Sequence, residues 1–179
     1  LDFAGSGVVH MVGGFAALAA VTVVGPRIGK YDDQGSPLPL PGSSMVAGAL
    51  GVFILWFGWY GFNVGSALAA VDVDLASIAV TTTLSAAAAS ISAMYTSMIS
   101  GKPDVSMTLN GALAGLVGIT PGAGYVSTGA GLFIGMISSI AANISCFFVK
   151  NTADIDDTLD VFSCHGICGM IGLLLTSLL

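Results

Sequence analysis

Two histidines lie deep inside long apolar segments of this chain, His10 in LDFAGSGVVHMVGG and His165 in DTLDVFSCHGICGMIG. A neutral imidazole carries one N–H donor and one accepting nitrogen, so two facing imidazoles can pass a proton between them. A polar side chain inside a membrane is costly unless it meets a partner or water, which makes it a candidate functional residue by default. The structural alternative is that each histidine only fills a packing defect through one hydrogen bond.

The segments around the histidines are typical of membrane helices. The chain has 179 residues, of which 55% are hydrophobic and 8% charged, far fewer charges than a soluble domain carries. A helix needs about 20 apolar residues to cross a bilayer, and Pro121-Gly122 interrupts the longest apolar stretch where a turn is expected. The sequence therefore predicts an all-α, polytopic membrane helix bundle, with one domain over 1–179 and six spans at about 3–24, 43–70, 75–99, 106–120, 124–149 and 159–179.

The basic residues fall in alternate connections between these spans. There are four of them, Arg27, Lys30, Lys102 and Lys150. The positive-inside rule makes their side cytoplasmic and places both termini outside. Four scattered charges form no basic patch, so a nucleic-acid partner is excluded. The connection over 27–41 contains SPLPLPG and is expected to be extended rather than helical.

Both histidines are predicted to lie near the membrane midplane. At about 1.5 Å of rise per residue, His10 is roughly 12 Å below the outer end of its span, and His165 is roughly 10 Å from the cytoplasmic end of its own. The two spans run in opposite directions, as the site-bearing spans of inverted-repeat transporters do. We therefore expect the two imidazoles to face each other within hydrogen-bonding distance.

The second span contains a row of aromatic residues that ends in a hydroxyl. Trp59, Phe62 and Ser66 in LWFGWYGFNVGSA follow at spacings of three and four, which puts them on one helix face. An aromatic face attracts a cation, and a hydroxyl oxygen accepts a hydrogen bond from it. The alternative for such a row is ordinary packing.

Two further groups of residues have other interpretations. Cys164, His165 and Cys168 with His10 suggest a metal site, but His165 is rotated about 100° from Cys164 around the helix, so we favour apolar packing of the thiols and expect no metal or cofactor. The third cysteine, Cys146, also lies inside an apolar span.

We expect Asp156, Asp157 and Asp160 to cap the last span. The sequence shows no nucleophile–base pair, so an enzyme is disfavoured.

Four motifs, in order and at matching separations, resemble the ammonium transporter family (the Amt/Mep/Rh superfamily): DFAGSGVVH, WFGWYGFNVGS, TLNGALAGLVGITPGAG and DDTLDVFSCHGICGMIG. The first motif is closer to the Amt branch than to the Rhesus branch. The resemblance implies an eleven-helix inverted-repeat fold, of which this chain holds spans five to ten as part of a longer protein.

The resemblance also implies roles for individual residues. It makes His10 and His165 the twin histidines of a narrow hydrophobic pore, Phe62 part of the outer gate, and Trp59 a pore-lining residue. It assigns Ser66 to ammonium recruitment and gives Asp2 an electrostatic or structural part in that site. It further implies ammonium or ammonia as substrate, a homotrimer in the plasma membrane, and a PII-type regulator at the cytoplasmic face. The alternative is an ammonium sensor that signals through an attached domain.

Overall fold

The chain forms a bundle of helices in a computed structural model that describes residues 1–179, except for the side chain of Ser100. The helices are α1 (Ser6–Val24), α2 (Met45–Gly65), α3 (Leu75–Ser97), α4 (Val105–Ile119), α5 (Thr128–Asn151) and α6 (Cys168–Leu178). Short 3-10 turns flank three of them: η1 (Phe3–Gly5), η2 (Met98–Ser100) and η3 (Thr120–Gly122). A π-helical turn, η4 (Phe162–Ile167), leads into α6. The predicted all-α fold class is confirmed.

Four segments of the described chain are long and apolar enough to cross a membrane: Phe3–Val24, Met45–Gly65, Leu75–Ser97 and Thr128–Asn151. The helix of α4 and the segment Phe162–Leu178 are shorter. α2 stops at Gly65, before the expected end at residue 70, because Ser66 closes the helix and Leu68 takes a left-handed φ of 53°. The chain is thus an integral, multi-pass membrane protein.

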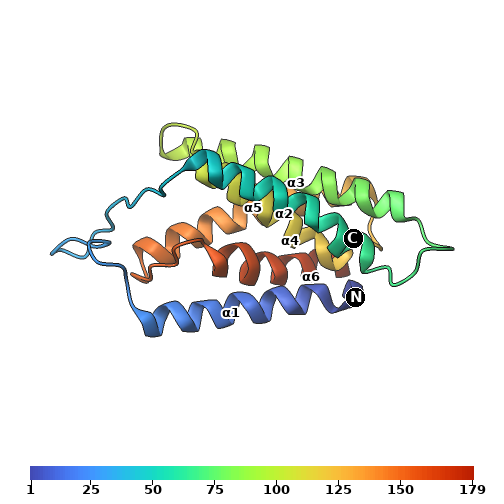
Figure 1. Cartoon of the computed structure of the whole chain (residues 1–179), viewed down its shortest axis with the longest axis horizontal. Coiled ribbons are helices and arrows are strands. Elements are labelled where there is room, and N and C mark those ends of the chain that lie inside the picture. Colours follow the sequence, from blue (N-terminus) through green and yellow to red (C-terminus); the bar gives the residue numbers. More distant parts are fainter.

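The connections between helices gather at two ends of the bundle (Figure 1). The α1–α2, α3–α4 and α5–α6 connections lie at one end, and both termini lie at the other with the α2–α3 and α4–α5 connections. The first end carries Arg27, Lys30, Lys102 and Lys150, so the four basic residues share one face as the charge pattern predicted. That this face is cytoplasmic stays a prediction.

Small residues hold α3, α4 and α5 together at close range. A Cβ added at Gly115 would lie 2.4 Å from the Cβ of Ala89, and one at Gly135 would lie 2.2 Å from the carbonyl oxygen of Ser85. Without side chains at these crossings, the helix backbones approach closely and gain packing contacts. The three helices pack closely against one another, and α6 and α2 pack against them.

The α1–α2 connection is fastened to the α5–α6 connection by an ion pair. Arg27 donates from Nε to Asp156 Oδ2 at 2.7 Å and from Nη2 to Oδ1 at 2.8 Å. The Tyr31 hydroxyl donates to the carbonyl oxygen of Lys150 at 3.3 Å. The connection over 27–41 is not helical, as expected, but it is not extended throughout: two hydrogen-bonded turns and a bridge between Tyr31 and Pro37 fold it back on itself.

The ion pair predicts a pH-dependent stability. The hydrogen bond from Arg27 lowers the pKa of Asp156 below its ordinary value. A carboxylate with a lowered folded-state pKa stabilises the fold above its unfolded pKa of about 3.9, and this contribution is lost as pH falls through the folded value. Asp156→Asn should therefore melt below the wild type at pH 7 in detergent, with a difference that shrinks under about pH 4. Asp154→Asn, at an exposed position in the same connection, is the control; a difference independent of pH would contradict the role of the charge.

Candidate functional site

The two histidines meet in the interior of the bundle. The Nδ1 atoms of His10 on α1 and His165 on η4 lie 3.1 Å apart, although the residues are 155 positions apart in sequence. The ring centroids are 5.1 Å apart and the ring planes differ by 26°. One Nδ1 must donate and the other accept, so the protonation pattern of one ring fixes that of the other. The contact expected from their matched depth is present.

Asp2 secures the start of the helix that carries His10. Its Oδ1 accepts from the backbone N–H of Gly7 at 2.7 Å, and its Oδ2 accepts from that of Val8 at 3.1 Å. The chain turns back to allow this through left-handed φ values at Ala4 (53°) and Gly5 (71°). A carboxylate here satisfies free N–H groups and complements the positive end of the helix dipole.

His165 lies in a π-helical turn, whose start is capped by a carboxylate. Asp157 Oδ2 accepts from the backbone N–H of Phe162 at 2.8 Å. Single π turns within helices recur at functional sites, because the wider turn changes the direction in which side chains point. The expectation that three aspartates cap this segment was correct for Asp157 alone.

The other two aspartates take partners elsewhere. Asp156 binds Arg27 from the α1–α2 connection, as described above. Asp160 pairs with Lys150 Nζ at 2.6 Å and accepts from Asn110 Nδ2 at 2.9 Å. Their carboxylates therefore join separate parts of the chain instead of capping the helix that follows.

Glycines allow α1 and η4 to cross at the level of the histidines. A Cβ at Gly14 would lie 2.2 Å from the backbone nitrogen of Gly166 and 2.4 Å from its Cα. On the other side of the pair, a Cβ at Gly169 would lie 3.2 Å from both the carbonyl oxygen of Gly7 and the Cβ of His10. The distance between the imidazoles is therefore set by direct backbone contact.

Aromatic rings from α2 cover the His10 imidazole. The Trp59 indole stacks on it with centroids 5.4 Å apart and planes 6° from parallel. Phe62 meets His10 edge to face at 5.5 Å and Trp59 at 5.8 Å. Trp59 is 8% exposed and Phe62 is 39% exposed, so Phe62 is the more exposed ring of this cluster.

Ser66 follows one turn after Phe62, at the end of α2. Its hydroxyl donates to the carbonyl oxygen of Phe62 at 2.7 Å. The hydroxyl oxygen keeps lone pairs with which it can accept a hydrogen bond from a cation. The structure thus brings His10, His165, Trp59 and Phe62 together and places Ser66 beside them along α2, while Asp2 acts on α1 through its backbone.

Sequence reasoning missed Thr120. The Trp59 indole Nε1 donates to Thr120 Oγ1 at 3.0 Å, and the Thr120 hydroxyl donates to the carbonyl oxygen of Leu116. The only signal in the sequence was its position before Pro121, at the end of a helical segment.

The thiols point away from the histidines. Cys164 Sγ contacts the carbonyl oxygen of Asn110 at 3.8 Å, and Cys168 Sγ contacts that of Ser138 at 3.3 Å. Within the described part of the chain, no His, Cys, Asp and Glu side chains form a group that could hold a metal ion.

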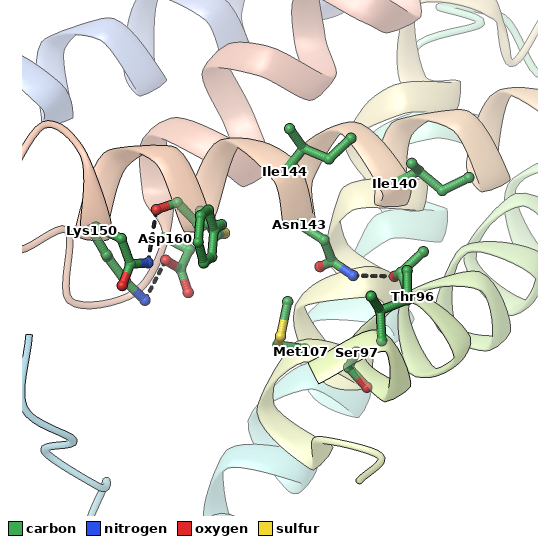
Figure 2. Close-up of a pocket in the computed structure, with 12 residues that line it drawn as sticks. Thr96, Ser97, Met107, Ile140, Asn143, Ile144, Lys150 and Asp160 are labelled. Atoms are coloured by element: carbon green, nitrogen blue, oxygen red, sulfur yellow. Dashed lines mark hydrogen bonds and ion pairs between the residues drawn. The ribbon is translucent and has the colours of Figure 1, made fainter. Parts of the chain in front are cut away.

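A hollow of about 530 Å³ lies apart from the histidine pair, at the end of the bundle that carries the basic residues (Figure 2). Its walls are mostly apolar, from the ends of α3 and α5, and its polar pairs are Lys150 with Asp160 and Asn143 with Thr96. A second hollow of about 710 Å³ along α3 shares Thr96 and Ile99 with the first. The residues predicted for the site line neither hollow.

Comparison with known proteins gives consistent matches. Residues 1–179 match the model of the Ammonium Transporter Family. Ammonium transporter Amt2 of Archaeoglobus fulgidus is 46% identical over 97% of this chain and 37% of its own length. Ammonium transporter Amt2 of Methanocaldococcus jannaschii is 43% identical over 99% of this chain and 41% of its own length. The chain thus spans well under half the length of these curated relatives.

Solved structures of proteins with similar sequences superimpose on this chain. A sensor Amt protein superimposes with a TM-score of 0.95 at 38% identity, covering 99% of this chain and 44% of that protein. Mep2 of Candida albicans superimposes with a TM-score of 0.84 at 37% identity, covering 96% of this chain and 38% of Mep2.

Proposed function

Because the chain belongs to the ammonium transporter family, we propose that the full-length protein moves ammonium or ammonia across a membrane through a narrow apolar pore. In this proposal the chain supplies a twin-histidine pair at the midplane and part of the outer mouth. The observation that carries the proposal is the partly buried 3.1 Å contact between the Nδ1 atoms of His10 and His165.

The crossing step follows from the cost of moving a charge through an apolar medium. A bare ammonium ion at the membrane centre is expensive, whereas neutral ammonia is not. A hydrogen-bonded pair of imidazoles can take up the proton that ammonium releases and pass it on, because each ring has a donor and an acceptor. The Nε2 atom of His10 is buried and makes no hydrogen bond within the described residues, so in this proposal its partner is a molecule in the pore.

The outer mouth is proposed to select and desolvate the cation. Phe62 and Trp59 present aromatic faces that attract ammonium, and the Ser66 oxygen accepts one of its hydrogen bonds. The two carboxylate oxygens of Asp2, at the same end of the bundle, add negative charge while they hold α1 in place.

The decisive experiment for transport and for the mouth is methylammonium uptake by the full-length protein in a transporter-deficient cell. Phe62→Ala should relax the preference for ammonium over larger amines, because the ring narrows the path.

Ser66→Ala should raise KM about tenfold and leave the maximal rate nearly unchanged, since one hydrogen bond to a charged ligand contributes about 1.5–3 kcal/mol. Leu174→Ala, on the exposed face of α6, is the control. Absence of uptake by a correctly inserted wild type would contradict transport, and unchanged KM and selectivity would contradict the mouth.

A sensor is the second candidate, favoured by the match to a sensor Amt protein. The same site would then bind the ion and signal through an attached domain. The full-length reading frame separates the two, because a sensor requires a signalling domain after the last span.

We further propose a homotrimer in the plasma membrane, with the basic face, which holds the Arg27–Asp156 pair, as the surface for a PII-type regulator. α2 exposes a row of large apolar side chains, Leu50, Phe53, Ile54 and Phe57. The hollow along α3 is lined in part by small residues, including Ala87, Ala88 and Ser92. The apolar row on α2 of one copy fits the hollow along α3 of the next copy. Repeated head-to-tail contacts of this kind close the copies into a ring.

A further inference from the structure

The hydrogen bond between Trp59 and Thr120 joins the histidine site to a helix that carries none of its predicted residues. Thr120 begins η3, directly after α4, and is fully buried. Its hydroxyl proton is directed to the carbonyl oxygen of Leu116, so its oxygen faces the indole as an acceptor. An indole N–H can only donate, which gives this hydrogen bond one direction.

The consequence for His10 follows from the stacking geometry. The Trp59 indole lies 6° from parallel to the His10 imidazole, so any rotation of the indole changes the surface against which the imidazole rests. His10 is held on one side by this face and on another by the hydrogen bond to His165. A buried indole N–H that loses its acceptor no longer favours the rotamer in which that acceptor lay, so the indole is free to take other orientations.

A second tryptophan shows that this hydrogen bond is specific to the site. Trp56 lies on the same helix, one turn away, and packs against the same apolar cluster. Its Nε1 makes no hydrogen bond within the described residues. The acceptor is thus provided for the indole that stacks on a histidine.

We propose that Thr120 is a positioning residue of the pore: its hydroxyl fixes the orientation of the Trp59 indole, whose face keeps the His10 imidazole in line with His165. This inference rests on the proposed function for its effect on transport. The orientation of Trp59 itself is measurable without transport.

The experiment compares two substitutions of one residue in the full-length protein. Thr120→Val keeps the shape of the side chain and removes the hydroxyl, whereas Thr120→Ser keeps the hydroxyl. Uptake kinetics should show a maximal rate lowered about tenfold in Thr120→Val with KM nearly unchanged, and both constants within about twofold of the wild type in Thr120→Ser. Thr81→Val is the matched control, because Thr81 is also fully buried but its hydroxyl makes no hydrogen bond within the described residues.

A double-mutant cycle with Trp59→Phe tests whether Thr120 acts through the indole. Thr120→Val should have little further effect on the rate when Trp59 is already phenylalanine, because coupled residues are not additive. Equal effects of Thr120→Val in both backgrounds, or equal rates for the valine and serine variants, would overturn the proposal.

Near-ultraviolet circular dichroism of the same variants separates this proposal from transport. The spectrum should change in Thr120→Val, remain in Thr120→Ser, and show no difference at position 120 in the Trp59→Phe background. If the wild type fails to transport, the proposed function fails, but the spectra of the Thr120 variants in the two Trp59 backgrounds still test whether Thr120 orients the indole. If transport holds and the spectra of all Thr120 variants match the wild type, the positioning fails alone.

Discussion

Replacing His10 or His165 by alanine in the full-length protein is expected to lower ammonium uptake by about two orders of magnitude, the scale at which a positioned proton-transfer group contributes. The 3.1 Å contact means that each ring needs the other as its hydrogen-bond partner, so either single substitution disables the pair. For the same reason the double substitution should cost little more than one alone.

Uptake of labelled methylammonium, normalised to the amount of folded protein in the membrane, measures this effect. Ser138→Ala is a suitable control, because this buried hydroxyl makes no hydrogen bond within the described residues. A double-histidine variant that folds and transports at the wild-type rate would leave only the packing role for the two imidazoles.

The second large effect is expected at Gly14. A methyl group there would lie 2.2 Å from the backbone nitrogen of Gly166, which no side-chain rotation can relieve, so α1 must move away from η4. We expect Gly14→Ala to lower the free energy of unfolding by about 1–3 kcal/mol and to reduce uptake severely, because the imidazoles separate with the backbones.

The neighbouring glycine provides the control for this prediction. A Cβ at Gly13 meets no atom of the described chain within 4 Å. Gly13→Ala should therefore be neutral, or stabilise the helix by about 0.5–1 kcal/mol. Thermal unfolding in detergent and uptake are measured on both variants. Similar behaviour of the two would show that the α1–η4 crossing does not set the spacing of the histidines.

The contact between the histidines was predictable from the sequence, whereas the turn that presents His165 was not. Depth along a helix follows from residue counting, so two histidines at equal depth on opposed spans were expected to meet. A π turn forms when backbone N–H groups bond to the carbonyl five residues back instead of four. Here the Phe162 N–H bonds to Asp157, and the backbone of Gly166 lies against Gly14, which are both details of the folded chain. Neither can be derived from periodicity.

The partners of the three aspartates before the last helix could not be predicted from the sequence either. Asp156, Asp157 and Asp160 are equivalent by sequence pattern, and each resembles a helix cap. Their partners separate them: Arg27 is 129 positions from Asp156, and Asn110 is 50 positions from Asp160. The role of Thr120 was likewise decided by a tertiary contact, with a tryptophan 61 positions away.

The direct contact of the two Nδ1 atoms limits how much charge the pair can store. With both rings fully protonated, two N–H groups would point at each other across 3.1 Å, so the pair accommodates one surplus proton and no more. Each surplus proton must leave before the next is accepted. If the full-length protein transports as proposed, one pore therefore handles its cargo in single file, the time needed to clear the pair limits turnover, and a cell gains capacity by making more copies of the protein.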